Sequence, residues 1–519
     1  MLRVLVIVDK TGTAIDRLAH GVQKYIKGVD YIICDVHPKR PSEEQIAKLE
    51  SAITMADIVD YQYFRTAEML RERYPELKTK PSILTHYNPY SIGESDWKNY
   101  DIVVTCNKAI QKELQKVRPT EYVPLAVDPE NYNYTEKLTE RDTVIMVANR
   151  IEPKKGILPV AQACERLGIN IILVGSISDA NYFSEIRKVS NLTFASGISD
   201  SELQELYARS TLHVCNSVDN FESGTMPIME AMHCGVPVLT RNIGHVPDLY
   251  NGENMVINPN EPDDIDALED LIGTILYDKQ KLESIRTAAW QTIKNYTPYR
   301  RSVMYSRMYR RLQSDETPVS VVVPISGNWD VAKACLTAIS KQTYPNLEIV
   351  VVDDSDISQI REVTSYSELI SIPLQYHYTG NGDYGLARAR NIGTIHATGD
   401  IIVYCDQRQI MDAAAVQEFV NNLKPRTWVF GDKGGGKKDF VENFGAIYRD
   451  DIIRAGMFCE RVNQYGGQSQ EIRARTRSQG ISHVYIESAK AKPAGKSSNK
   501  YRRRAEIIRM KDLLWTMGL

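Results

Sequence analysis

The chain has 519 residues, of which 43% are hydrophobic and 25% charged, values typical of a soluble globular protein with room for about three domains. No apolar run reaches the roughly 20 residues of a membrane-spanning helix, and the run at 4–8 is too short for a signal-peptide core, so we expect a cytoplasmic protein without a transmembrane segment. The eight cysteines form no C-x-x-C pair, which argues against a zinc site or a disulfide framework.

The first 313 residues alternate apolar, strand-like runs with helical patterns. Residues 1–140 predict strands at 3–8, 31–36, 82–85, 102–106 and 122–124. Residues 141–313 repeat the scheme with strands at 143–148, 171–175, 192–195, 212–215 and 237–240, followed by helix over 263–312, broken near Pro298. This alternation predicts an α/β fold of two doubly wound, Rossmann-like domains, with a ligand at the carboxyl ends of the strands.

A third α/β unit is expected over 318–487, with its clearest strands at 319–324, 347–353 and 401–404. Residues 488–519 form a basic tail that is poor in apolar residues up to 504 and is expected to be loosely held. A second basic run, 300–311, places arginines on one helix face. Such runs are usually solvated surface, but two of them also raise the possibility of contact with a polyanion, either nucleic acid or an anionic membrane.

Two carboxylates eight positions apart, Glu222 and Glu230, flank the small turn Ser223-Gly224-Thr225. The apolar run that contains Glu230 reads as a helix. A loop that leads into a helix presents unpaired N–H groups, which suit a diphosphate. The carboxylates suit sugar and ribose hydroxyls, from which they accept hydrogen bonds. The pair therefore predicts a nucleotide-sugar site.

Several motifs in one order make residues 1–313 resemble a retaining GT-B glycosyltransferase of family four. They are the loop at Gly12, the run 147–156, the strand-ending glycine of 173–175, and the segment from Glu222 to Glu230. The resemblance implies a GT-B pair, with the acceptor side in 1–140 and the donor side in 141–313.

The same resemblance implies roles for individual residues. A departing diphosphate needs fixed positive charge, and Arg150 and Lys155 are placed to provide it without a metal ion. Glu230 is expected at the ribose hydroxyls and Glu222 at the donor sugar, with Gly12, Gly224 and Thr225 lining the donor site. His86 falls where the family often has a histidine near the reacting centre, so Glu222 and His86 are the catalytic candidates.

Residues 318–487 resemble a second family, the inverting GT-A glycosyltransferases of family two. The matching runs are 318–324, 342–354, 385–393 and 397–406. The resemblance implies that Asp353 and Asp354 contact a nucleotide. A metal-dependent member needs a second acidic residue two positions after Asp406, and Arg408 stands there, so the case for Mg²⁺ or Mn²⁺ is weakened.

The inverting mechanism also needs a carboxylate base, which the family places in a Glu-Asp pair after a double glycine. Here Gly466-Gly467 is followed by Gln468 and Ser469, and Glu471 matches a different family position. We therefore expect a degenerate GT-A-like unit that helps to bind the acceptor. Arg408 in place of the metal's charge keeps a metal-free enzyme open.

The sequence thus predicts transfer of a hexose or pentose from a UDP- or GDP-type donor, with retention, at the N-terminal unit. The acceptor is expected to be a saccharide, a lipid-linked sugar or a hydroxylated base in DNA. Three alternatives stay open: a bifunctional transferase, a sugar-nucleotide-binding protein without catalysis, and another GT-B enzyme such as a phosphorylase or an epimerase.

Overall fold

The computed structural model describes residues 2–26, 28–37, 41–87, 96–116, 120–135, 142–218, 226–294, 296–370, 372–380, 385–434, 439–462 and 467–494. The chain divides into two compact units, Met1–Ser302 and Val303–Leu519. The division falls inside helix α12 (Pro298–Gln313), whereas the sequence places the boundary after it. Within the described residues, no helix is both long and apolar enough to cross a membrane.

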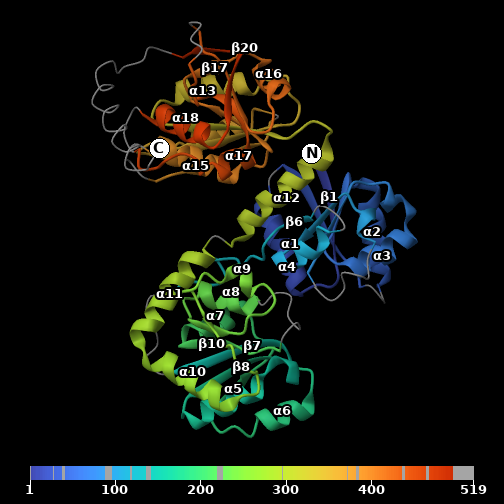
Figure 1. Cartoon of the computed structure of the whole chain (residues 1–519). Coiled ribbons are helices and arrows are strands. Elements are labelled where there is room, and N and C mark those ends of the chain that lie inside the picture. Colours follow the sequence, from blue (N-terminus) through green and yellow to red (C-terminus); the bar gives the residue numbers. More distant parts are fainter. Residues whose placement is uncertain are drawn as a thin grey trace. The chain divides into compact units, whose positions relative to one another are not determined.

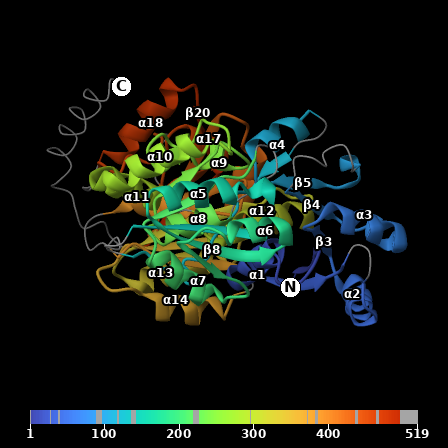
Figure 2. The ribbon, with the colours of Figure 1, turned by 90° about the horizontal axis from the view of Figure 1, so that it is seen from below.

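The first sheet of the N-terminal unit is parallel, in the order β2-β1-β3-β4-β5-β6. Helices α2 and α3 pack on one face through buried aliphatic side chains, and they lie together on the side opposite α1 (Figure 1 and Figure 2). The elements are β1 (Leu2–Val8), α1 (Ala14–Tyr25), β2 (Val29–Asp35), α2 (Glu43–Met55), β3 (Ile58–Tyr61), α3 (Phe64–Arg73), β4 (Ser82–His86), β5 (Ile102–Thr105), α4 (Lys108–Leu114) and β6 (Thr120–Tyr122).

The second sheet is also parallel, in the order β12-β11-β10-β7-β8-β9, with helices on both faces (Figure 1). The elements are β7 (Thr143–Ile151), α5 (Ile157–Arg166), β8 (Asn170–Ile177), α6 (Ala180–Ile186), β9 (Leu192–Ala195), α7 (Asp200–Ala208), β10 (Leu212–Cys215), α8 (Met226–His233), β11 (Val238–Thr240), α9 (Val246–Leu249), β12 (Val256–Ile257), α10 (Ile265–Tyr277) and α11 (Lys279–Ile293). The predicted pair of Rossmann-like sheets is confirmed.

The C-terminal unit has one mixed sheet in the order β15-β14-β13-β16-β19-β18-β20-β17. Its elements are β13 (Val319–Ile325), α13 (Trp329–Ile339), β14 (Leu347–Asp353), α14 (Ile360–Ser367), β15 (Leu374–Tyr378), α15 (Leu386–His396), β16 (Ile401–Cys405), β17 (Gln409–Met411), α16 (Ala415–Asn422), β18 (Thr427–Asp432), β19 (Phe444–Tyr448), α17 (Arg449–Arg454), α18 (Gln468–Ser478) and β20 (Ser482–Pro493).

Alternating side chains of β13 explain why both faces of this sheet are covered. Val319, Val321 and Val323 pack with α13, α14 and α16 in one core, whereas Val322 packs with α15, α17 and α18 in another. Because successive side chains of a strand point to opposite faces, a run of valines buries both. A third α/β unit is therefore confirmed.

Two sequence expectations need correction at this level. Strand β20 continues to Pro493 and pairs with β17 there, so residues 488–493 belong to the sheet and not to a tail. Residues 495–519, the rest of the expected tail, lie outside the described residues.

The basic run 300–311 is also not the exposed face that the sequence predicts. Arg301 is buried and donates to the carbonyl oxygens of Val123 and Pro124. Within the C-terminal unit, Arg307 and Arg311 both pair with Asp400. Arg310 pairs with Glu348 and donates a hydrogen bond to Asn346. These arginines therefore stabilise the fold through hydrogen bonds and ion pairs inside each unit. Of the five arginines in 300–311, Arg300 is the exposed one.

Candidate functional site

The turn after β7 places Lys155 at the carboxyl end of the strands of the second sheet. Residues Pro153–Lys155 form one 3-10 turn, which ends at Gly156 in the left-handed conformation, with φ of 59°. A Cβ at Gly156 would lie 2.2 Å from the carbonyl oxygen of Asn216, so only glycine fits there. This close approach brings the loop after β7 against the loop after β10, at the ends of these two neighbouring strands.

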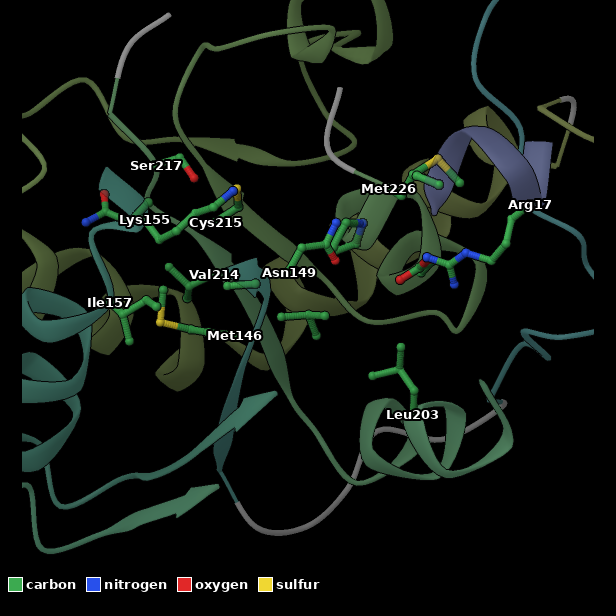
Figure 3. A pocket seen from close by; sticks show the side chains of 16 residues that line it. Arg17, Met146, Asn149, Lys155, Ile157, Leu203, Val214, Cys215, Ser217 and Met226 are labelled. Atoms are coloured by element: carbon green, nitrogen blue, oxygen red, sulfur yellow. The ribbon is translucent and has the colours of Figure 1, made fainter. Parts of the chain in front are cut away.

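A pocket of about 120 Å³ opens between these two loops and the start of α8. Its apolar part comes from β7, β10 and α7, including Met146, Val214 and Leu203 (Figure 3). Its polar lining consists of Arg17, Asn149, Lys155, Asn216, Ser217 and Glu230. The pocket thus lies at the carboxyl ends of parallel strands, where α/β folds bind their ligands.

A bulge near the end of β7 decides which side chain enters the pocket. The pairing with β8 passes from Ala148 to Arg150, so Asn149 is the extra residue. Bulges re-aim side chains, and Asn149 lines the pocket while the side chain of Arg150 is 60% exposed and lies 3.5 Å from Glu152 (Nε to Oε1). Among the described residues, the pocket therefore brings Lys155 and Glu230 together but not Arg150.

Glu230 is an acid buried in the second turn of α8. It is 3% exposed, and its Oε2 accepts a 3.4 Å hydrogen bond from the hydroxyl of Tyr207. Burial raises the pKa of Glu230 to about 7, since it disfavours the charged form. The positive charge of Arg17 opposes this shift, and the negative charge of Asp200 adds to it. A buried acid at a pocket wall is costly unless it binds something.

The other residues predicted for this site do not line the pocket or lie outside the described residues. Glu222, Gly224 and Thr225 lie outside the described residues. Gly12 has φ of 80° and open space around it, just before Thr13 caps helix α1. His86 ends β4, is 1% exposed, and packs between Trp97 and Phe64, with ring centroids 4.8 and 5.9 Å away. The structure does not place His86 in the pocket.

In the C-terminal unit, two predicted nucleotide ligands are used in hydrogen bonds within the protein. Asp353 is fully buried and accepts from the backbone N–H of Gln359 at 2.7 Å and the hydroxyl of Tyr376 at 2.6 Å. Asp354 accepts from the hydroxyl of Thr379 and the N–H of Gly385, both at 2.7 Å. Both carboxylates hold the loops at the ends of β14 and β15.

A buried arginine pairs with the third predicted acid of this unit. Arg390, fully buried on α15, donates to Asp406 at 2.8 Å and to Glu442 at 2.9 Å. Burial favours the protonated form of Glu442, but the charge of Arg390 and a hydrogen bond from Ser469 outweigh it and lower its pKa. Arg408 is exposed.

These residues do not fit a divalent cation. Ions such as Mg²⁺ take several oxygen ligands, and Asp406 faces an arginine instead of a second acid. The described residues contain no group of three or more acidic, histidine or cysteine side chains that is arranged to hold a metal.

Sequence reasoning did not identify Arg17, Asn149, Asn216 and Ser217 as lining the pocket. It also missed Tyr207, which donates to Glu230, and Glu442, which pairs with Arg390. Asn149 sits beside the predicted Arg150, and only the bulge identifies it. Arg17 follows the Gly12 loop by one helical turn, which is the one sequence signal that was available.

Comparison with known proteins supports both halves of this description. Residues 130–292 match the family described as Glycosyl transferases group 1, and residues 320–439 match Glycosyl transferase family 2. An uncharacterized glycosyltransferase of Rickettsia felis is 25% identical over 145 residues, which are 28% of this chain and 23% of that protein. An MMP alpha-(1->4)-mannosyltransferase of Mycolicibacterium hassiacum is 24% identical over 192 residues, covering 34% of this chain and 46% of that protein.

The chain thus spans about a quarter to a half of the length of these two curated relatives. Among solved structures, sucrose-phosphate synthase from Thermosynechococcus elongatus has a TM-score of 0.50 at 15% identity, covering 61% of this chain and 100% of that chain. That likeness shows the fold. The chain therefore carries a group 1 glycosyltransferase domain of GT-B type that includes residues 130–292, followed by a family 2 glycosyltransferase domain of GT-A type that includes residues 320–439.

Proposed function

We propose that the N-terminal unit transfers a sugar from a UDP- or GDP-type nucleotide sugar to an acceptor hydroxyl, with retention at the anomeric carbon. The observation that carries this proposal is the pocket at the carboxyl ends of parallel strands, which is lined by both buried Glu230 and Lys155. One relative of the chain is named a mannosyltransferase, in keeping with hexosyl transfer.

The chemistry follows from the charges of the pocket. Cleavage of the sugar–phosphate bond leaves negative charge on a diphosphate, and Lys155 with the first turn of α8 stabilises it. Glu230 binds the ribose hydroxyls, because a carboxylate accepts stronger hydrogen bonds from hydroxyl groups than a neutral oxygen does. The anomeric carbon becomes oxocarbenium-like, as in glycoside hydrolysis. Glu222 remains the proposed catalytic residue, on the strength of the family resemblance, whereas His86, proposed on the same ground, is buried and does not line the pocket.

The C-terminal unit binds the acceptor in this proposal and does not itself catalyse. Asp353 and Asp354 hold loops, Arg390 neutralises Asp406, and Ser469 stands where a carboxylate base is expected. The acceptor is a saccharide or a lipid-linked sugar. DNA is the weaker candidate, since most arginines of 300–311 pair within the protein.

The test measures release of nucleoside diphosphate from a panel of UDP and GDP sugars by the purified full chain in EDTA. We expect Glu230→Ala and Lys155→Ala to lower the rate by about 100-fold each, the size of loss seen when one charge-stabilising group is removed. The matched control is Lys154→Ala, because Lys154 lies in the same turn but is exposed. Asp406→Asn should leave the rate within about twofold.

The opposite pattern would reassign the activity. If Asp406→Asn abolishes turnover while Glu230→Ala retains it, the C-terminal unit is the active one. If no sugar nucleotide of the panel is turned over or bound, the chain is not a transferase of this donor class.

A further inference from the structure

Arg17 comes from a different part of the chain than most residues that line the pocket. It lies in the first turns of α1, which follows β1 of the first sheet, whereas the other described lining residues outside α1 lie between 146 and 230. Figure 3 draws Arg17 and Lys155 at opposite ends of the pocket. Two cations from separate parts of the chain therefore face one small cavity.

The surroundings of Arg17 leave it able to bind a ligand. Its Nη1 lies 3.4 Å from Oδ1 of Asp200, and the two side chains are 45% and 42% exposed. An exposed pair of this kind contributes little stability. A guanidinium has five N–H donors, so a contact through one nitrogen leaves donors that can turn to an incoming group.

The remaining polar groups near Arg17 limit what that group can be. Glu230 and Asp200 are acids near Arg17, so an anion can bind on this side of the pocket only if N–H donors of Arg17 offset their charge. Arg150, expected from the sequence to serve a diphosphate, does not line the pocket because the bulge at Asn149 turns it away. The pocket therefore has one cation from its own sheet, Lys155, and one from α1.

We propose that Arg17 binds the diphosphate of the donor, exchanging its contact with Asp200 for phosphate oxygens. The planar guanidinium matches phosphate in a bidentate manner, which a single lysine cannot do. This inference rests on the proposed function, since it names a further binding residue for the same donor. It also means that donor binding ties helix α1 to the second sheet.

The experiment compares a nucleoside diphosphate with its nucleoside, by calorimetric titration of the full chain. UDP and GDP are both tried, and the one that the natural protein binds is used with uridine or guanosine. Arg17→Ala should weaken diphosphate binding by about ten- to hundredfold, the range for losing hydrogen bonds to a charged group. Nucleoside binding should change by less than about twofold, and Arg17→Lys should recover part of the diphosphate affinity.

The matched control is Arg166→Ala. Arg166 is 49% exposed and pairs with Asp266, and neither residue lines the pocket, so its loss should change neither affinity. Melting temperatures show that each variant is folded.

Two outcomes would overturn the inference while leaving the proposed function intact. Arg17→Ala with unchanged diphosphate affinity would show that Arg17 does not touch the donor. An equal loss for nucleoside and diphosphate would show that Arg17 only positions Glu230. If the natural protein binds neither UDP nor GDP, the proposed function fails, and with it this inference.

Discussion

Replacing Glu230 by glutamine should stabilise the protein while it weakens donor binding. Burial raises the pKa of Glu230 to about 7, from an ordinary value of 4.5. The folded protein therefore resists ionisation of this acid, whereas the unfolded chain does not. Glutamine carries no charge, has nearly the same shape, and keeps an oxygen that can accept the hydrogen bond from Tyr207.

The sign and the size of the effect follow from linkage. A folded pKa above the unfolded value costs no stability below pH 4.5, and the cost grows until the pH passes the folded pKa near 7. With these two values, ionisable Glu230 costs about 1 kcal/mol at pH 5 and about 3 kcal/mol at pH 8. For a unit of this size, the larger figure corresponds to a rise in melting temperature of roughly 5 °C for Glu230→Gln.

The assay is thermal unfolding at pH 5 and pH 8, with and without UDP-glucose or GDP-mannose. Glu205→Gln is the matched control, because Glu205 lies on neighbouring α7 and its side chain is 70% exposed. We expect the Glu230→Gln variant to melt higher at pH 8, to lose most of that gain at pH 5, and to lose stabilisation by the donor. A variant that melts no higher than the natural protein at pH 8 would refute the reasoning, as would a gain that is equal at both pH values.

Two further predictions concern buried charge elsewhere. Burial lowers the pKa of His213 and of His245 to about 4, so both side chains are neutral in the folded protein at neutral pH. The stability that each neutral histidine contributes is present above pH 6.5 and is lost as the pH falls towards 4. The loss amounts to about 3 kcal/mol for each residue. His213→Gln should therefore flatten the fall of melting temperature between pH 7 and pH 5, and an unchanged slope would contradict the assignment. Arg390→Met should destabilise the C-terminal unit by about 3–5 kcal/mol, because Asp406 and Glu442 lose their common partner. Calorimetry should then show that unit melting earlier, with donor stabilisation of the N-terminal unit unchanged; a single unshifted transition would count against the pair.

Much of the fold could be predicted from local patterns. Strands such as β1, β7 and β14 are continuous apolar runs, because parallel strands are buried on both faces. Strand β3 was missed, since its four residues contain the buried Asp60 and so break the apolar run. Asp60 is tolerated there because it accepts a 2.7 Å hydrogen bond from Gln62, a contact that no periodicity reveals.

The antiparallel half of the third sheet was also not predicted. Strand β20 pairs in parallel with β18 over 482–490 and antiparallel with β17 near its end. Its residues include several exposed charges, and this polarity resembles that of a tail. Strand β20 is therefore defined by its backbone pairing with β18 and β17, and not by an apolar pattern in its sequence.

The sequence by itself determined the three α/β units and the positions of Lys155 and Glu230, because these depend on local backbone preferences and on which residues must be buried. Gly156 must be glycine where the chain turns left-handed, and Glu230 must lie on an apolar helix. Only the tertiary structure decided which polar side chains meet. A one-residue bulge puts Asn149 in the pocket and turns Arg150 away, and packing brings Arg17 to the pocket from helix α1. Such contacts depend on strand register and on the approach of distant segments, which nearest-neighbour patterns in the sequence do not encode.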